Sequence, residues 1–526
     1  MQTDAEHCGT CETSCDEAAS CSGGQCVCAG EGVSDCDGEC TNLLADPNHC
    51  GSCGEVCESF EACQAGKCRF EDDGCGGDPN NISLTNVVLY QAVEVQLMTG
   101  GMAISPETRN ADIIQNRDAV LRASVELETG TSPRAISLRL VLRNDDDETI
   151  LFHRRTVNAS STQGDLGSTF LIDVPAALIG PNTSYVVSLA DCEDAASAGS
   201  VGDIAWPRDG AIAALGARKV GRVKLVFLPL VHDNLTPDTT DAALASYAAG
   251  VMAQYPIEGV DYRAVPAIES GFTGINFDWG RMLDETVFAK RRDDAPAADE
   301  YYYALVKPTE RLGQYCQGGC TAGIGYLTSG ATAMNVPYRT ALGLGFNEEV
   351  SWSTLPHELG HNHGRDHAPC GGVNDDKNYP YEGASIGSYG MSIADHALLE
   401  PSKYVDFMSY CSPTWISDYT FQALAERVAA VNEDSNQRAK TVGVQRSWWS
   451  LLSTSSGRRW SSPRTTEGAL DDPLAGFVYD QNLNPLAEVE LGKIPLSGGG
   501  AFVLLVPPPE QGWYAVGIAG ETPFPY

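Results

Sequence analysis

The pattern of hydrophobic and polar positions changes along the chain, and its first regular part has a period of two. Segments 86–97, 118–128 and 135–143 show this period-two patterning, and segments 170–174 and 184–189 continue the series. Because alternation is typical of half-buried strands and no helical period intervenes, the pattern predicts an immunoglobulin-like β-sandwich over residues 80–215. The acidic run 144–148 separates two strands and is either a solvated hairpin tip or a calcium site.

A different pattern begins near residue 220. Segment 223–231 is continuously apolar, which favours a buried strand, and segment 237–254 has the pattern of a capped helix. A further strand is predicted at 301–306 and an amphipathic closing helix at 421–431. Together these elements predict a mixed domain of strands and helices over residues 220–435.

The C-terminal part returns to alternation. Residues 433–466 are rich in Ser, Arg and Thr, and they are typical of a linker that contains a strand at Trp448 and Trp449. Segment 476–520 alternates again, with three consecutive prolines at 507–509 as a break. We expect a small β-domain over residues 445–526, acting either as a packing partner or as a substrate-binding accessory.

The strongest chemical signal lies in the middle of the chain. Residues 357–367 fit the pattern H-E-x-x-H-x-x-G-x-x-H and contain four of the nine histidines. On a helix, His357 and His361 project from one face at a spacing that suits a single metal ion. Gly364 can end that helix in a left-handed conformation, so that His367 supplies a third nitrogen. Three protein ligands leave one position of a tetrahedral zinc ion open, which is typical of a catalytic site.

The residues around these ligands complete the hypothesis. Glu358 is not needed as a ligand and is predicted to take a proton from the attacking water. Ser353 and Thr354 are N-cap candidates, and Pro356 suits a first turn, so the helix is expected from about Ser353 to His363. His363 falls outside the ligand spacing and is expected beside the ligands or on the surface. The alternative is a surface helix whose histidines bind nothing.

At this point the sequence resembles the metzincin clan of zinc peptidases, which implies an α+β catalytic domain over residues 220–435. The clan carries a tight turn with a methionine beneath the zinc, and residues 406–411 (DFMSYC) match it. By resemblance, Met408 forms the hydrophobic floor under the histidines, and Tyr410 hydrogen-bonds the oxyanion during catalysis.

The resemblance also suggests substrate-binding residues. In metzincins an edge strand pairs with extended substrate, and the glycine-rich segment 322–328 with Gly323 and Gly325 corresponds to it. An ordinary strand with glycine bulges is an equally good interpretation. Trp415 either lines a substrate pocket or is a buried aromatic residue.

A closer resemblance is to the StcE-type secreted mucinases of bacteria. It rests on segments 379–390, 406–419 and 367–370 and covers roughly residues 220–430. This group cuts mucin-like O-glycosylated proteins, so the resemblance implies protein or glycoprotein substrates.

The cysteines divide into two groups. Of nineteen cysteines, fourteen precede residue 76, and the spacing of those at 8, 11, 15, 21 and 26 recurs 42 residues later at 50, 53, 57, 63 and 68. So small and polar a module, residues 1–76, is expected to be held by disulfides, with zinc binding as the competing interpretation. By resemblance, Cys370 and Cys411 both lie close to the metal and are paired. Cys316 and Cys320 can close a short loop, which leaves Cys192 over.

Charge and hydropathy narrow the range of functions. The chain has 70 acidic and 34 basic residues, a formal charge of −36, which argues against nucleic acid and anionic membranes as partners. No apolar run is long enough to span a membrane. Residues 1–4 are polar, so we expect a removed leader and a secreted or bacterial cell-surface protein.

The expected architecture is multidomain: a disulfide-rich N-terminal module and an α+β metzincin-like catalytic domain flanked by β-sandwich domains. The expected function is zinc-dependent endopeptidase activity, with one catalytic Zn²⁺ and Ca²⁺ as a further candidate. The alternative is a cell-surface binding or adhesion protein with an inactive metal site. An intact Glu358 argues against that alternative, because a decayed site tolerates loss of the base.

Overall fold

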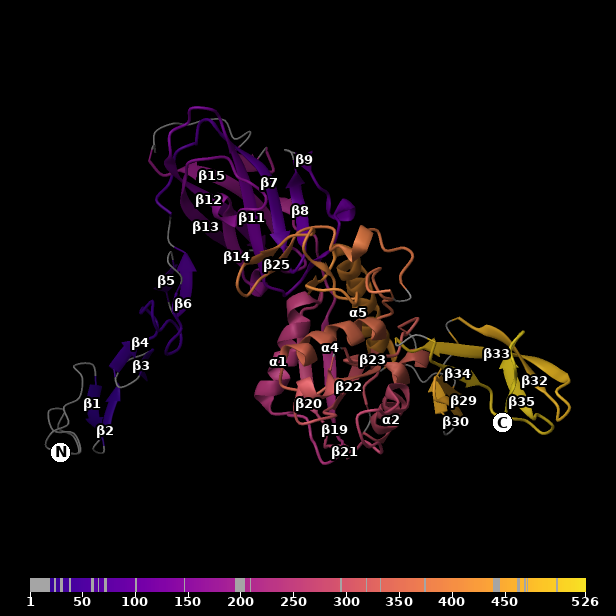
Figure 1. The fold of residues 1–526 in the computed structure, drawn as a ribbon. Helices are drawn as coiled ribbons and strands as arrows, with labels where there is room; N and C mark the ends of the chain where they lie inside the picture. Colours follow the sequence, from indigo (N-terminus) through magenta and orange to yellow (C-terminus); the bar gives the residue numbers. More distant parts are fainter. Residues whose placement is uncertain are drawn as a thin grey trace. The chain divides into compact units, whose positions relative to one another are not determined.

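The computed structural model of the protein describes residues 19–22, 25–28, 32–36, 39–57, 61–64, 66–70 and 73–526, apart from 100–101, 146, 194–203, 209, 294–295, 318, 332, 373–374, 439–444, 461–463, 468–469, 471 and 498–499. Within these residues the protein is multidomain and mostly β, with few helices and a disulfide-rich N-terminal region (Figure 1). It divides into two compact units. One comprises Met1–Asn86, Ala123–Ile172 and Ser184–Ala214, and the other comprises Val87–Arg122, Asp173–Thr183 and Leu215–Tyr526.

Short antiparallel hairpins open the first unit. They pair β1 (Ala19–Ser22) with β2 (Gln25–Cys28), β3 (Val33–Cys36) with β4 (Glu39–Asn42), and β5 (Glu61–Gln64) with β6 (Lys67–Phe70). Disulfides join Cys28 to Cys40, Cys36 to Cys53 and Cys50 to Cys63, and Cys21 and Cys57 are also disulfide-bonded. Disulfides rather than zinc therefore hold these cysteines, as predicted. Cys8, Cys11 and Cys15 of the first repeat lie outside the described residues.

A larger sheet also lies in the first unit. Its strand order is β13 (Asp147–Val157), β12 (Arg134–Asn144), β15 (Ser184–Asp191) and β16 (Ala205–Trp206), and β17 (Ala213–Ala214) also pairs with β15. The expectation that Cys192 is left over was wrong, because Cys192 is bonded to Cys75. The reason is a long-range contact: Gly77 bridges Asp191, which brings the end of the cysteine-rich region beside β15.

A second sheet has five strands. Its order is β14 (Phe170–Val174), β11 (Ala119–Leu127), β7 (Ile82–Tyr90), β8 (Glu94–Thr99) and β9 (Met102–Ala103). The single strand predicted at 86–97 is thus two strands, separated at Ala92, whose φ of 84° reverses the chain. The hydrophobic pattern did not reveal this turn, because the residues of the turn are buried. The Gln91 side chain takes the place of water there by forming hydrogen bonds with the backbone of Ile114 and Arg117.

The second unit is built on a mostly parallel sheet. Its order is β20 (Gly259–Ala264), β19 (Arg222–Val231), β22 (Glu300–Val306), β24 (Thr340–Leu344) and β23 (Gly323–Gly325), and β21 (Ile268–Glu269) pairs with the end of β19. All pairs are parallel except β23 with β24. Residues 225–230 are buried without interruption, as the apolar run predicted. The antiparallel β23 lies at the edge of the sheet.

Helices of the second unit cover this sheet (Figure 1). They are α1 (Asp241–Gln254), α2 (Trp279–Arg292), the short α3 (Leu312–Tyr315), α4 (Glu349–Asn362) and α5 (Asp418–Arg438). Thr240 and Asp278 cap α1 and α2 by accepting backbone hydrogen bonds from Ala243 and Arg281. Helix α4 packs against β23, β24 and α1. Short strand pairs complete the region: β10 (Ile113–Ile114) with β18 (Ala217–Arg218), β25 (Gly390–Ser392) with β26 (Ala397–Leu399), and β27 (Val405–Asp406) with β28 (Thr414–Trp415).

The C-terminal residues of the second unit form another sheet. Its order is β30 (Gly457–Trp460), β29 (Gln445–Thr454), β34 (Phe502–Val506), β33 (Pro485–Pro495), β32 (Leu474–Tyr479), β35 (Ala515–Ile518) and β36 (Phe524–Pro525), and β31 (Arg464–Glu467) pairs with β29. The segment interpreted as a linker, 433–466, therefore contains three strands among its described residues. Trp448, Leu451 and Leu452 are buried there. The many Ser, Arg and Thr residues of the segment led to the linker interpretation, although they surround these buried positions.

One hydrophobic core joins the parallel sheet to this C-terminal sheet. Its buried members come from both, and include Leu228, Met282, Val306, Ile324, Tyr326, Leu342, Trp448, Leu452, Ile494, Leu496, Val503 and Leu505. A shared dry core of this kind fixes the C-terminal strands against β23. Within the described residues, the helices are too short or too polar for any of them to cross a membrane.

Candidate metal centre

Helix α4 carries the first two predicted ligands, and its C-terminal end is shaped to present the third. Gly364 has a φ of 80°, Gly364 N donates to His361 O, and Arg365 N donates to Gly360 O. This pair of bonds is a Schellman motif, which closes a helix and turns the chain sharply. A methyl group at Gly364 would lie 2.8 Å from Thr328 O, so the position has both a conformational and a steric reason to be glycine.

The predicted start of this helix was wrong. It begins at Glu349 rather than near Ser353, and Pro356 lies inside it. The hydroxyls of Ser353 and Thr354 donate to Val350 O instead of capping the helix. Proline has no N–H for Trp352 O, but the helix continues because it is packed. Leu355 and Pro356 are buried, and Tyr255 Oη donates to Pro356 O.

The three histidines converge on one point. His357 Nε2 and His361 Nε2 are 3.2 Å apart, and the ligand atoms of His357, His361 and His367 all lie within 4.8 Å of one another. His357 Nδ1 is 2.7 Å from Phe407 O, and His361 Nδ1 is 2.7 Å from Arg365 O. Because a carbonyl oxygen can only accept, each Nδ1 carries the proton and each Nε2 keeps its lone pair for a ligand.

The protonation states suit a cation at this point. Burial, together with the neighbouring histidines, lowers the pKa of His357 to about 4 and that of His361 well below its ordinary value. Neutral imidazoles are the form that binds metal. His361 and His367 are buried and His357 is half-buried, and three imidazoles that converge in this way are a donor set that fits zinc.

Glu358 lies on the same helix and is also buried. Burial raises its pKa to about 8, and a hydrogen bond from Ser497 Oγ at 3.3 Å acts in the opposite direction. A cation beside it would favour the ionised carboxylate. Glu358 is therefore a titratable group held out of bulk water beside three candidate ligands, which is the arrangement expected of a general base.

The turn containing Met408 lies under the helix. A methyl group on Gly360 would come within 2.4 Å of Met408 Sδ. The thioether therefore packs directly on α4 at Gly360, which lies between His357 and His361 in the sequence. Asp406 holds the turn: its carboxylate accepts from Met408 N and from Ser417 N. Through Phe407 O, this turn also orients His357. The structure thus places Met408 against α4 at Gly360, next to His361 in the sequence.

Tyr410 and the predicted disulfide follow the turn. The ring centre of Tyr410 is 4.7 Å from that of His367 and 5.8 Å from that of His357, and its side chain is 55% exposed. The Cys370–Cys411 disulfide forms as the resemblance implied, and Tyr410 N donates to Cys370 O. The Cys316–Cys320 disulfide is also present. An exposed phenol beside two ligands can reach a bound substrate.

The glycines of β23 lie directly on Glu358. A methyl group at Gly323 would be 2.7 Å from Glu358 Oε1, and one at Gly325 would be 2.8 Å from Glu358 O. Glycine is required here for close approach of the strand to α4, a reason that neither sequence interpretation included.

Trp415 and His363 make packing contacts and do not belong to the cluster of three histidines. Trp415 Nε1 donates to Ala92 O and its indole packs on Gly390, which supports the packing interpretation of this residue. His363 is buried rather than exposed. Its ring stacks on Tyr301 at 4.6 Å and its Nδ1 bonds Leu359 O, so it faces away from the ligands.

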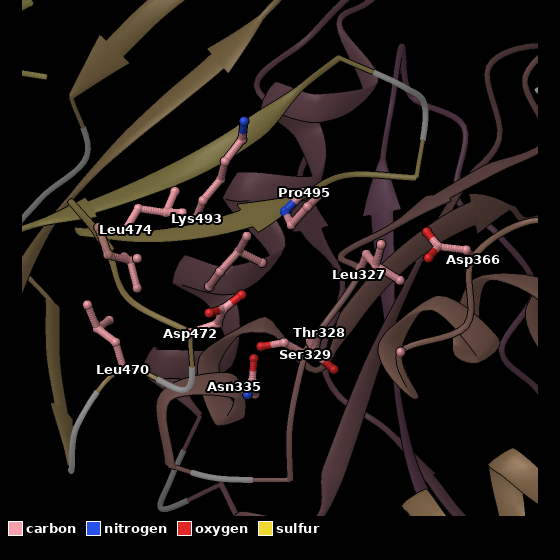
Figure 2. Close-up of a pocket in the computed structure, with 14 residues that line it drawn as sticks. Leu327, Thr328, Ser329, Asn335, Asp366, Leu470, Asp472, Leu474, Lys493 and Pro495 are labelled. Carbon is pink, nitrogen blue, oxygen red and sulfur yellow. The ribbon is translucent and has the colours of Figure 1, made fainter. Parts of the chain in front are cut away.

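Two neighbouring cavities lie beside the ligands. One of about 240 Å³ is lined by His361, His367, Asp366, Ser497 and Phe502, among others. The other, of about 370 Å³, shares Leu327, Asp366, Lys493 and Pro495 with it and extends to Asn335 and Asp472. Figure 2 shows Lys493 and Pro495 on β33 along one side of this second cavity, with Leu327, Thr328 and Ser329 lining it from the other.

Ser497 and Phe407 are contributors that sequence analysis missed. Phe407 acts through its carbonyl, which no residue pattern reveals, although its position beside Met408 was a usable signal. Ser497 lies 139 residues from Glu358, in a domain predicted to be either a packing partner or a substrate-binding accessory. Nothing in the sequence marks that contact, because it depends on the shared core.

A protein-family model matches the N-terminal region. Residues 28–71 match the profile of the stigma-specific STIG1-like protein family. Curated proteins give no match. Among solved structures, a chain of "Structure of a chaperone-substrate complex" is 9% identical with a TM-score of 0.24, over 51% of this chain and 39% of that chain. That likeness is too low to bear on fold or function. The STIG1-like match and the disulfides are compatible with an extracellular or surface protein.

Proposed function

We propose that the protein is a zinc-dependent endopeptidase that cleaves extracellular proteins, with mucin-like glycoproteins as the first substrates to test. One observation carries the proposal: three imidazole groups, two of them bonded through Nδ1 to backbone carbonyls, converge within 4.8 Å beside a buried carboxyl group. A structural zinc site needs four ligands and no adjacent carboxyl group, so this arrangement favours catalysis.

The residues divide the chemistry among them. His357, His361 and His367 would hold zinc, which supplies Lewis-acid chemistry for activating water and polarising a carbonyl group. Glu358 accepts the proton of the attacking water and passes it to the departing amine. Tyr410, exposed beside His367, donates a hydrogen bond to the negative oxygen that develops on the cleaved peptide.

The resemblance to metzincins supports the same assignment. It accounts together for the long histidine pattern, for Met408 under α4 and for Tyr410 two residues later. We extend the proposal to a metzincin-type α+β catalytic fold in a protein secreted or displayed by a bacterium. Substrate choice within mucin-like proteins depends on surfaces outside these residues.

The test is metal-dependent proteolysis. The purified protein is treated with 1,10-phenanthroline, dialysed, and reloaded with Zn²⁺, Ca²⁺ or Mg²⁺ before incubation with casein and, separately, with an O-glycosylated mucin. We expect cleavage to disappear with the chelator and to return with zinc alone. Zinc-loaded protein that cleaves neither substrate, or protein whose activity survives loss of zinc, would contradict the proposal and leave a binding protein as the better account.

A further inference from the structure

The open edge of the sheet beside Glu358 is already partly occupied. Leu344 N donates to Ala322 O, and Tyr326 N donates to Thr340 O. Because strand residues alternate, the peptide groups of Gly323, Gly325 and Leu327 point the other way, toward the free edge. That edge runs along Glu358, so an extended peptide reaching the base would meet it.

A segment of the C-terminal sheet pairs with part of that edge. Leu327 N donates to Pro495 O, Ser497 N donates to Gly325 O, and Leu496 forms an antiparallel bridge with Tyr326. Gly325 N donates to Ser497 Oγ at 2.9 Å. The segment 495–497 therefore behaves as a short added strand over Gly325–Leu327.

The added strand is fixed rather than loosely laid on the edge. Leu496 is 3% exposed and belongs to the same core as Ile324 and Tyr326 of the neighbouring strand region. Removing the segment would expose this apolar surface, which opposes its displacement by a substrate. Gly323 is left on the edge without a partner among the hydrogen bonds of the described residues.

Ser497 connects the added strand to the base. Its hydroxyl accepts from Gly325 N and can donate only one proton, which points to Glu358 Oε2 at 3.3 Å. Because the Ser497 hydroxyl is held in place by Gly325 N, it fixes the position of the Glu358 carboxylate. This is the kind of support that keeps catalytic groups in place.

We propose that residues 495–497 form a fixed wall strand of the cleft, which leaves only Gly323 for pairing with the substrate backbone and uses Ser497 as a positioning residue for Glu358. The proposal rests on the proposed peptidase function. Beside residues 495–497, the substrate lies against the cavity lined by His361, Lys493 and Phe502. The protein therefore recognises the substrate there through the substrate's side chains or the groups attached to them.

Hydrogen exchange tests the wall without relying on activity. Amide exchange is measured for Gly323, Gly325, Leu327 and Ser497 in the zinc-loaded protein, with and without a peptide hydroxamate as an extended ligand. We expect Gly325, Leu327 and Ser497 to be protected in both states, and Gly323 to gain protection only with the ligand. Fast exchange of Ser497 in either state would show that the strand is absent or displaced, and would overturn the proposal.

Kinetics test the role of Ser497. The Ser497→Ala variant is expected to lose about tenfold in kcat, with KM within about twofold and unchanged zinc content, and Ser497→Thr to recover most of the loss. The matched control is Ser450→Ala, a fully buried serine of β29, which should match the wild type. A Ser497→Ala enzyme with wild-type kcat overturns the positioning role. If the wild type itself cleaves nothing, the peptidase proposal fails, while hydrogen exchange still tests whether residues 495–497 form a fixed strand.

Discussion

The N-terminal hairpins and the histidine centre reach a defined structure by opposite means. Between residues 28 and 63, disulfides join successive hairpins, and the buried cluster of the described residues there consists of Cys50, Cys57 and Cys63. Around α4, by contrast, order comes from burial, with Leu355, Leu359 and Met408 at most 2% exposed. Covalent links suffice where apolar residues are scarce, whereas a dry core is needed to hold neutral imidazoles and a carboxyl group in fixed positions.

The N-terminal hairpins and the histidine centre also differ in what their sequences and their structures reveal. Residues 28–71 match a known family, yet they bring together no group with evident catalytic chemistry among the described residues. The family model does not extend to the centre at α4, where the candidate ligands and the buried Glu358 lie. If this contrast is right, changes at the centre should alter zinc binding and activity, while changes in the hairpins should leave both intact.

The largest effect is expected from removing a ligand. His367→Ala leaves two imidazoles, so zinc should be lost at modest chelator concentrations and cleavage of casein should fall below detection. Zinc content by mass spectrometry under native conditions and the cleavage rate are the measurements. Full zinc occupancy in this variant would show that His367 is not a ligand.

A smaller but still large effect is expected from Tyr410→Phe. An interaction made mainly in the transition state lowers kcat without changing substrate binding, so kcat should drop roughly 10- to 1000-fold at nearly constant KM. Because the side chain is 55% exposed, the melting temperature should not change. A rise in KM alone would instead assign Tyr410 to substrate binding.

A pair of cysteine variants compares the two regions directly. Cys411→Ser opens the Cys370–Cys411 bond beside the site, and Cys36→Ser opens the Cys36–Cys53 bond in the hairpins. Each should cost its own region about 2–4 kcal/mol of stability. Only Cys411→Ser should speed zinc loss to a chelator, while only Cys36→Ser should make the hairpins sensitive to proteolysis. Equal zinc loss in both variants would contradict the separation.

A further predicted effect is a pH dependence of the metal-free protein. Burial lowers the pKa of His363 to about 3 and that of His357 to about 4, whereas both titrate near 6.5 when unfolded. As pH falls below 6.5 the unfolded chain binds protons that the folded chain excludes, so stability declines. The loss is about 1.4 kcal/mol per histidine and pH unit until the folded pKa is reached.

Urea unfolding at pH 7 and pH 4.5 measures this effect. His363→Phe should flatten the dependence without affecting zinc binding, because its ring stacks on Tyr301 away from the ligands. A wild-type pH dependence that His363→Phe leaves unchanged would contradict the account of neutral buried histidines.

Local pattern predicted much of the fold but not its long-range contacts. The strands β11, β12, β14, β15, β19 and β22 lie close to their predicted positions, because alternation and apolar runs report burial directly. Helix α2 and strands β30 and β31 were not predicted, and of β29 only a strand at Trp448 and Trp449 was expected. The burial of α2 and β29 is created by the core shared with the parallel sheet, a property of tertiary packing.

The candidate site shows the same limit. His357, His361 and His367 could be named in advance because helix geometry and one glycine turn relate them within eleven residues. Gly323, Gly325 and Ser497 approach Glu358 from 33 to 139 residues away. For the glycines, composition hinted at a special strand but not at close packing on α4. For Ser497, no local feature distinguishes it from other serines.

The most direct test of the central claim compares wild type with Glu358→Gln. Both proteins are loaded with zinc, their metal content is measured, and their rates of casein cleavage are determined side by side. Since Glu358 is not a ligand, the account predicts about one zinc in each. It predicts a rate at least about two orders of magnitude lower for the variant, the scale expected for loss of a general base. A Glu358→Gln protein that binds zinc and cleaves casein at close to the wild-type rate would contradict the account.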